Sequence, residues 1–385
     1  MSVSEMGLKV GDGGQDTARL LESPGLVSGN DETGQQKKPR TMASPSALAQ
    51  DQAAQTENAW GRSSGEIRRA VRLSFGPEKL TARPDGWRSS VLLARTFAMI
   101  GLGVVLLGLS DAIFWPLSFV LIGVAQYHLS VAIHEASHFG LFRSKWANEL
   151  LGTTLATLIG FGLKPYRRHH WSHHRLFGSA EDPDFGLYNG GYRSWAGFAA
   201  DMTNKFTLVG LARRVLPIFL PQRRSGSEAS RAASSPYAHP LAFFLSQALI
   251  FGLFTWAAAW WTYFVFWLLP LTIFPGLLNG LRMFGEHGGL TDGEGPQVLR
   301  ARTTMTRKEL WRRPLAGLER FVMAPFNFNL HHEHHLFPQL PYHALPSLHD
   351  HLVSEGYYQA HPEVLSDSYL HTFRRLTKTG TTAAQ

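Results

Sequence analysis

The sequence contains no cysteine among its 385 residues. This absence excludes disulfide bonds, thiolate zinc sites, cysteine nucleophiles and any iron–sulfur cluster held by the chain itself. Metal or catalytic chemistry in this protein must therefore use other side chains. The 18 histidines are the first candidates.

Charged residues are also few, at 17% of the chain, and the excess of Lys and Arg gives a formal net charge of +8. A positive balance suits a nucleic-acid-binding protein, and it equally suits a membrane protein with basic cytoplasmic loops. The mean hydropathy of −0.11 averages polar segments with very apolar ones. We therefore favour a membrane protein and expect no nucleic-acid partner.

Large apolar residues are scarce in residues 1–58, which are rich in Gly, Ser, Gln, Asp and Glu. Such a composition cannot bury enough surface to offset the entropy of the chain, so a disordered tail is expected. The tail lacks the charged start and apolar core of a signal peptide. Residues 59–90 are basic and mixed, which predicts a segment on the membrane surface before the first span.

Two long apolar regions follow, Val91–Ile133 and Pro240–Leu281. At roughly 20 residues per helical span, each region is long enough for two membrane helices joined in a hairpin. A third apolar stretch, Leu150–Leu163, is short for a span and fits an interfacial or re-entrant helix. The sequence thus predicts an all-α integral membrane protein with four transmembrane helices in two hairpins.

The distribution of positive charge predicts the orientation of these helices. The loops that flank the hairpins are basic, whereas the turns within the hairpins carry almost no positive charge. Because cytoplasmic loops carry the excess of Lys and Arg, both termini and the long loops are expected in the cytoplasm. The basic residues of these loops are Arg83, Arg88, Arg143, Lys145, Arg167, Arg168, Arg213, Arg214, Arg223 and Arg224.

Histidines concentrate in three short windows, each of which follows an apolar segment. The windows read His134-Glu-Ala-Ser-His138, His169-His170-Trp-Ser-His173-His174 and His331-His332-Glu-His334-His335. Residues three or four apart share one face of a helix, so most of these imidazoles project together. The side chains that share faces are His134 and His138, then His170, His173 and His174, and finally His331, His334 and His335.

The number of imidazoles indicates two metal ions, because one metal rarely takes more than six ligands. A structural zinc site is closed and four-coordinate, and two irons with open positions for oxygen fit the count better. His169 and His332 lie off the shared faces and are expected to have other roles. Neighbouring carboxylates are candidates to hold the second ring nitrogens of the ligands. They are Glu135, Glu181, Asp182, Asp184, Glu286 and Glu333.

The three windows resemble the three histidine boxes of the membrane fatty-acid desaturase and hydroxylase superfamily. The third box is similar down to the trailing Leu336-Phe337-Pro338 and the later Pro341. Further similarity to bacterial members lies in Asn148-Glu149-Leu150-Leu151-Gly152 and Glu181-Asp182-Pro183-Asp184. The resemblance covers about residues 90–355, so we expect a membrane domain over 91–355 and a C-terminal tail over 356–385.

The resemblance implies four transmembrane helices capped by a cytosolic helical domain that holds two irons. It also implies that His287, after the fourth helix, is a further ligand. Where some family members have a water-linked asparagine four residues earlier, this chain has Met283, so no such role is assigned. The implied reaction is the O2-dependent oxidation of an unactivated aliphatic C–H bond, with desaturation of a fatty acyl chain or lipid as the main expectation.

The electron donor is expected to be a separate ferredoxin or b-type cytochrome with its reductase. The chain has no cysteine for an iron–sulfur module and no Pro-Gly-Gly segment like that of fused b-type cytochrome domains. Basic loops with Arg213, Arg214, Arg223 and Arg224 are candidates to dock an acidic donor.

Three other functions are compatible with parts of the sequence. A hydroxylase or ketolase of a lipid, carotenoid or other apolar substrate would use the same di-iron chemistry, and the histidine boxes do not separate these outcomes. A zinc-dependent membrane hydrolase would need fewer ligands. A metal transporter would place its ionisable ligands within the spans, whereas these clusters lie outside them.

Overall fold

The structure is a computed structural model, and it describes residue 60 and residues 63–109, 112–188, 196–197, 200, 239–290, 296–305 and 314–379. The expected disordered tail over 1–58 lies outside the described residues. So do the four arginines at 213, 214, 223 and 224 that the sequence suggests for donor docking.

Four helices in the described part of the chain are long and apolar enough to cross a membrane. They are α4 (Gly86–Gly108), α5 (Trp115–Ser137, preceded by the short η1, Ala112–Phe114), α12 (Pro240–Ala257) and α13 (Leu269–His287). A π-helical turn, η2 (Phe264–Leu268), leads directly into α13, so that the fourth apolar segment runs from Phe264 to His287. The predicted number of apolar helices long enough to span a membrane is therefore confirmed, and these helices mark the protein as a membrane protein.

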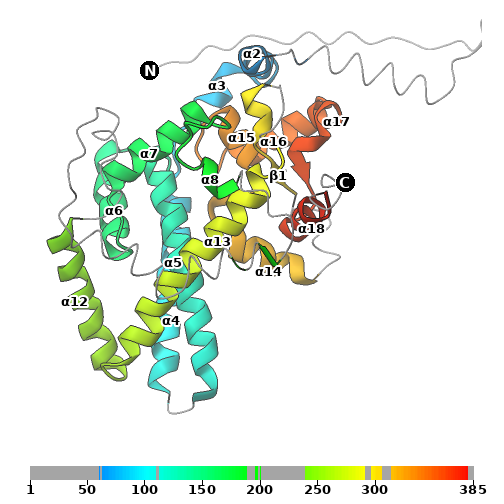
Figure 1. The fold of residues 1–385 in the computed structure, drawn as a ribbon. Helices are drawn as coiled ribbons and strands as arrows, with labels where there is room; N and C mark the ends of the chain where they lie inside the picture. The colour runs from blue at the N-terminus through cyan, green and yellow to red at the C-terminus, as the bar shows by residue number, and fades with distance from the viewer. Residues whose placement is uncertain are drawn as a thin grey trace, which may run out of the picture.

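Helix α5 occupies the centre of the four (Figure 1). Within its apolar window 67% of the residues are buried, against 28% in α4, 28% in the fourth segment and 17% in α12. Close packing is possible because small residues face the neighbours. A side chain at Gly123 would collide with Phe274 of α13, and one at Gly103 of α4 would approach the Ile122 side chain to 2.7 Å.

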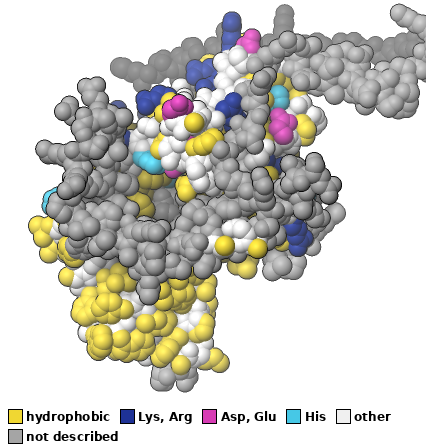
Figure 2. All heavy atoms as spheres, viewed as in Figure 1, with side chains coloured by type: hydrophobic (Ala, Val, Ile, Leu, Met, Phe, Trp, Pro, Cys, Tyr) yellow, Lys and Arg dark blue, Asp and Glu magenta, His cyan; other side chains and the backbone are white. Residues whose placement is uncertain are grey.

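The outer faces of the apolar helices carry exposed hydrophobic side chains. Leu102 and Val105 of α4 are 50% and 61% exposed, and Leu245 and Leu249 of α12 are 63% and 76% exposed. Hydrophobic side chains dominate the lower end of the molecule, which is formed by these long helices (Figure 2). Apolar surface of this extent is expected to face lipid, since water would not favour it.

The other end of the molecule is built from shorter elements (Figure 1). They are α2 (Ser64–Phe75), α3 (Pro77–Leu80), α6 (Lys145–Leu158), α7 (Leu163–Leu176), α8 (Phe185–Tyr188), η3 (Gln297–Arg300), β1 (Thr303–Thr304), α14 (Pro314–Met323), η5 (Pro325–Asn327), α15 (His331–Leu336), α16 (Leu345–Ser354), α17 (Tyr357–Ala360), η6 (Pro362–Val364), β2 (Leu365–Ser366) and α18 (Tyr369–Thr379). The third apolar stretch begins within α6, which has 14 residues and is too short to span a membrane, and continues through a turn to Leu163 at the start of α7.

The segment expected on the membrane surface, residues 59–90, packs differently from that prediction. Helix α2 begins with a capping box in which Ser63 and Glu66 exchange hydrogen bonds. Its apolar side chains, Ile67, Val71 and Phe75, are buried in a cluster with residues of α15 and α16. The apolar face of α2 is therefore covered by protein and is not available to lipid, and α4 already begins at Gly86.

The expected C-terminal tail from residue 356 is also folded over much of its length. Strand β2 pairs in parallel with β1, so that Thr303 is opposite Leu365 and Thr304 is opposite Ser366. In α18, Tyr369 is 2% exposed, and its hydroxyl donates to Glu286 Oε1 at 2.8 Å. This short segment gains its order from long-range contacts with α13 and β1.

Candidate metal centre

The first histidine pair lies where α5 ends. His134 is in the last turn, and His138 is the C-cap residue. The guanidinium of Arg167, on α7, donates to the carbonyl oxygens of Ser137 (2.8 Å) and Ala136 (3.1 Å). Because the last carbonyls of a helix lack partners within it, Arg167 both caps α5 and fixes α7 against it.

The second cluster occupies one face of α7. His170 and His173 are buried at 6% and 1% exposure, and His174 lies beside them on the side toward the third cluster. The third cluster forms α15, a helix of six residues in which every side chain is buried.

Buried polar groups hold α15 in position. Arg302 is 1% exposed and donates to the carbonyl oxygens of Gly285 (2.6 Å), near the end of α13, and of Glu363 (3.1 Å). The side-chain amide of Asn329 donates to Thr304 O of β1 at 3.0 Å. These bonds join the end of α13, which carries His287, to the segment that carries the third cluster.

The nine predicted ligands meet in two groups at this end of the molecule. In the first group the ring nitrogens lie within 4.8 Å of one another, and its members are His134, His138, His170, His174 and His334. The Nε2 atoms of His138 and His170 are 2.8 Å apart, those of His170 and His174 are 3.0 Å apart, and those of His174 and His334 are 3.1 Å apart.

The second group contains the remaining four imidazoles. His173, His287 and His335 offer nitrogens within 4.8 Å of one another, and His331 joins them through His287 and His335. The Nε2 atom of His331 is 3.1 Å from that of His287 and 3.1 Å from that of His335. A carboxylate oxygen of Glu286 lies 3.4 Å from His331 Nε2 and completes a further possible donor set.

This geometry fits metal ions. Two imidazole nitrogens bound at ~2.1 Å to one metal, at roughly 90° to each other, would lie ~3.0 Å apart. The Nε2 separations of 2.8–3.1 Å match that spacing. The buried Nε2 atom of His134 has no hydrogen-bond partner among the described residues, as expected of a lone pair directed at a cation.

Ligation requires neutral imidazoles, and burial favours the neutral form of several of these rings. Burial, followed by the charge of Arg167, lowers the pKa of His138 to about 3. Burial and the neighbouring imidazoles likewise hold the pKa values of His334 and His335 well below their usual range. A neutral ring can offer a lone pair to a metal, so the site is prepared for cations without first releasing protons.

Carboxylates contact the outer ring nitrogens of two of the predicted ligands. Both oxygens of Asp182 are 3.0 Å from His173 Nδ1, and Tyr188 donates its hydroxyl to the same carboxylate. Glu135 Oε1 is 3.0 Å from His134 Nδ1. Contacts of this kind select the tautomer whose Nε2 faces the metal.

The other predicted carboxylates behave differently. Glu333 contacts none of the nine ligands, and instead bonds His349 at 2.5 Å and the hydroxyls of Thr303 and Tyr358. Burial opposes ionisation of Glu333, but these hydrogen bonds and the neighbouring imidazoles outweigh it and lower its pKa to about 2. Glu181 is exposed, and Asp184 contacts mainly His169, at 2.9 Å.

His169 and His332, which the spacing places off the shared faces, contact other groups. His332 uses both ring nitrogens in the protein, Nδ1 toward Ala301 O (2.9 Å) and Nε2 toward the hydroxyl of Tyr357 (2.9 Å). His169 is half-exposed beside Asp184. Neither ring contributes to the two groups.

Arg282 is a site residue that the sequence analysis did not single out. It is 5% exposed, pairs with Glu286, and donates to Asn279 Oδ1 at 3.0 Å and Met283 Sδ at 3.1 Å. Its guanidinium lies over the ring of Phe328, 4.1 Å from the centroid. A charged residue inside an apolar span is a functional signal, which could have identified it.

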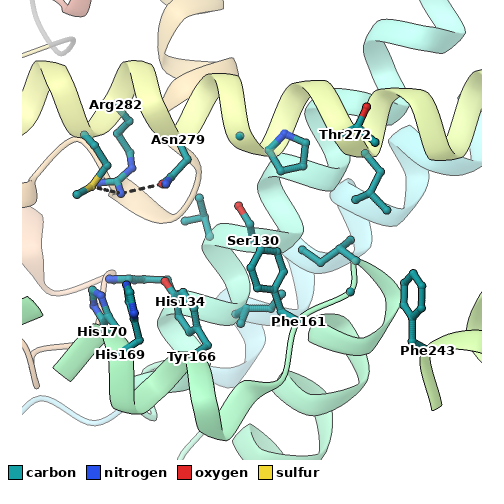
Figure 3. A pocket seen from close by; sticks show the side chains of 18 of the residues that line it. Ser130, His134, Phe161, Tyr166, His169, His170, Phe243, Thr272, Asn279 and Arg282 are labelled. Atoms are coloured by element: carbon teal, nitrogen blue, oxygen red, sulfur yellow. Dashed lines mark hydrogen bonds between the residues drawn. The ribbon is translucent and has the colours of Figure 1, made fainter. Parts of the chain in front are cut away.

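A cavity of about 860 Å³ extends from the histidines into the apolar helices. Figure 3 shows Asn279 and Arg282 directed from α13 toward a wall that carries His134, Tyr166 and His170. Apolar side chains line most of the remaining surface, including those of Val131, Ile159, Phe161, Leu268 and Leu271. Phe243 lies at the end opposite His169 and His170 (Figure 3), and Gln247, Tyr263 and Phe264 also line the cavity.

Comparison with known proteins agrees with this arrangement. The family model for fatty acid desaturase matches residues 110–366. The chain is also 26% identical over 275 residues to dihydrorhizobitoxine desaturase of Bradyrhizobium elkanii, an alignment that covers 68% of this chain and 74% of that protein. With its paired histidine groups at the end of an apolar cavity, this oxidoreductase belongs to the fatty acid desaturase family.

Proposed function

We propose that the protein is a di-iron desaturase that introduces a double bond into the aliphatic chain of a fatty acyl group or lipid. The single observation that carries this proposal is the position of the nine imidazoles. They form two groups at one end of a mostly apolar cavity in a membrane protein. Membership of a family of oxidoreductases favours oxidation over zinc-dependent hydrolysis.

Two irons are the metals that suit these donors. His134, His138, His170, His174 and His334 would hold one, and His173, His287, His331 and His335 would hold the other. Imidazole is a good ligand for iron, and more than four imidazoles exceed the needs of a closed zinc site. When bound, the two irons supply the O2-dependent abstraction of hydrogen from an unactivated C–H bond.

The cavity is suited to hold the substrate chain. Its volume falls in the range of roughly 300–1,000 Å³ of ligand sites, and its walls are mainly apolar. Each methylene that leaves water for such a wall contributes about 0.8 kcal/mol to binding. His134, His170 and His331 contribute to one end of the lining, so a chain in the cavity is held against the metal ligands.

The polar residues at that end have distinct tasks. Arg282 neutralises Glu286 in the buried site, and Glu286 lies beside His331. Asp182 accepts a hydrogen bond from Nδ1 of His173, which keeps the Nε2 atom of that ring directed inward. Together these groups orient the ligands, whereas the electrons come from a separate ferredoxin or b-type cytochrome with its reductase.

We further propose that the four apolar helices form two hairpins, with the shorter elements as a cap on the cytoplasmic side. The basic residues of the cap support this orientation, because cytoplasmic segments carry the excess of Lys and Arg. The two chain ends would then lie in the cytoplasm with the metal centre.

Hydroxylation or ketolation of an apolar substrate is the second candidate. Ser130, Thr272 and Asn279 line the cavity and could accommodate an oxygen atom of a substrate or product. Desaturation is preferred because the relative from Bradyrhizobium elkanii is named as a desaturase.

Isotope labelling separates the two outcomes. Cells that express the protein are supplied with perdeuterated fatty acids and 18O2, and their lipids are measured by mass spectrometry. Desaturation predicts loss of two deuterium atoms without uptake of 18O, and a His173→Ala variant should give no product. Hydroxylation predicts loss of one deuterium and gain of one 18O. Unaltered lipids in cells with well-expressed, iron-loaded protein would contradict both candidates.

A further inference from the structure

The outer face of α7 carries a stripe of exposed cations around a tryptophan. Its members, Lys164, Arg168, Trp171 and Arg175, are spaced four, three and four residues apart and therefore share one side of the helix. All four are exposed. The opposite side of the same helix carries three of the proposed ligands, and the helix contains no acidic residue. We call these four residues the α7 face.

Trp171 connects this face with the metal centre. The side chain is 39% exposed, yet its ring centroid lies 5.0 Å from that of His138 and 5.8 Å from that of His174. Both imidazoles belong to the five-histidine group. A molecule that touches Trp171 from outside is thus separated from two proposed ligands by one aromatic ring.

Helix α2 adds further positive charge near this position. Arg68 donates to the carbonyl oxygens of Leu336 (3.0 Å) and His335 (3.2 Å), while Arg72 is exposed. Gln297 connects the two regions, because its side chain donates to the carbonyl of Arg175 at 3.2 Å and the next residue, Val298, donates to Ser64 of α2. Figure 2 shows Lys and Arg side chains gathered at this end of the molecule, away from the hydrophobic end.

We propose that the α7 face docks an acidic one-electron carrier protein, with Trp171 at the centre of the contact. This inference rests on the proposed function, which requires a reductant that the chain does not contain. Opposite charges accelerate encounter and set the orientation of the partner, and an aromatic residue at the centre of an interface supplies contact area. The carrier loses one electron per encounter. Two encounters therefore supply the two electrons that, with two protons, O2 and two C–H hydrogens, leave one C=C bond and two waters.

A protein fits the α7 face better than the bilayer does. A helix that lies in the membrane surface inserts an apolar face beneath its charged side. In α7, the side opposite the cations is occupied by histidines that point into the protein, so no apolar face remains for lipid. The stripe has three cations and one aromatic residue, which complements an acidic protein surface.

Charge reversal on the face tests the proposal. Full-length protein in nanodiscs is titrated with a plant-type acidic [2Fe–2S] ferredoxin, and the Kd is measured at low and high salt. Arg168→Glu/Arg175→Glu is expected to raise the Kd about tenfold at low salt, with a smaller effect at high salt. The matched control, Arg374→Glu/Arg375→Glu, makes the same charge change on exposed residues of α18 and should bind like the unaltered protein.

The rate of iron reduction gives a second readout. In anaerobic stopped-flow experiments the α7 double variant should be reduced about tenfold more slowly by the ferredoxin and at an unchanged rate by dithionite. Trp171→Ala, but not Trp171→Phe, should slow the ferredoxin reaction at equal iron content.

Three results would overturn the docking proposal: no binding of the ferredoxin to the unaltered protein, equal Kd values for all variants, or a loss confined to binding of anionic-lipid vesicles. A failure of the proposed function is distinguishable, because the unaltered protein would then hold no iron that dithionite can reduce.

Discussion

Asp182 provides the sharpest single test of how the metal centre is held. Its carboxylate is 4% exposed and lies 3.0 Å from His173 Nδ1 through both oxygens. It also accepts hydrogen bonds from the hydroxyl of Tyr188 and from the backbone N–H of Asp184 at 2.9 Å. The carboxylate is therefore fixed by the fold before any metal binds, and it in turn fixes the ring of His173.

The cost of removing this carboxylate follows from these contacts. A hydrogen bond to a charged group contributes about 1.5–3 kcal/mol, which corresponds to roughly 10- to 100-fold in an equilibrium constant. The same range describes the loss of metal affinity when a carboxylate behind a histidine ligand is removed. Asp182→Ala should therefore weaken iron binding ~10- to 100-fold, whereas Asp182→Asn, which keeps one acceptor oxygen, should have a smaller effect.

The assay is retention of iron by the purified protein in competition with a chelator. Asp367→Asn is a suitable control, because this carboxylate is 69% exposed and contacts only His371 among the described residues. Equal chelator resistance of Asp182→Ala and the unaltered protein would refute the role assigned to Asp182. A loss of the folded protein would appear separately in its thermal unfolding and gel filtration.

Three further predictions concern stability. Arg282→Met leaves the buried Glu286 carboxylate without its partner and should destabilise the protein by about 3–5 kcal/mol, measured as a lower Tm in detergent. The double variant Arg282→Met/Glu286→Gln should regain part of this stability, because the unpaired charge is then removed. Arg302→Leu removes the hydrogen-bond donor to the buried carbonyl of Gly285, at about 1–3 kcal/mol, and to the part-buried carbonyl of Glu363, so it should also lower the Tm. An unchanged Tm would contradict the bonds described. The metal-free protein should lose stability as the pH falls below about 6.5. Histidines of the unfolded chain then bind protons, whereas His138 of the folded protein, with a pKa of about 3, does not. A Tm that stays constant from about pH 7 to pH 5 would contradict this prediction.

The local features of the candidate metal centre were predictable from the sequence. The spacing of three and four residues places imidazoles on common helix faces, and α7 and α15 have the expected form. The position of His332 outside the two histidine groups was predictable for the same reason, since its ring points away from the shared face toward Tyr357. Span length and apolar composition likewise identified the four long helices.

The features that depend on long-range contacts were not predictable. Spacing did not reveal that His173 separates from its neighbours His170 and His174 and joins the other group with His287. The amphipathic helix α2 resembled a membrane-surface segment, because its pattern does not say whether lipid or protein covers the apolar face. Glu333 is adjacent in the sequence to proposed ligands, but its buried side chain turns away from the two histidine groups toward His349.

The most direct test of the account is the metal content of the detergent-purified protein, measured together with a His173→Ala variant. We expect about two irons per chain in the unaltered protein and fewer in the variant, because His173 belongs to the group of four imidazoles proposed to hold one of the irons. A folded, homogeneous sample that contains one zinc and no iron would contradict the di-iron centre and, with it, the proposed oxidation.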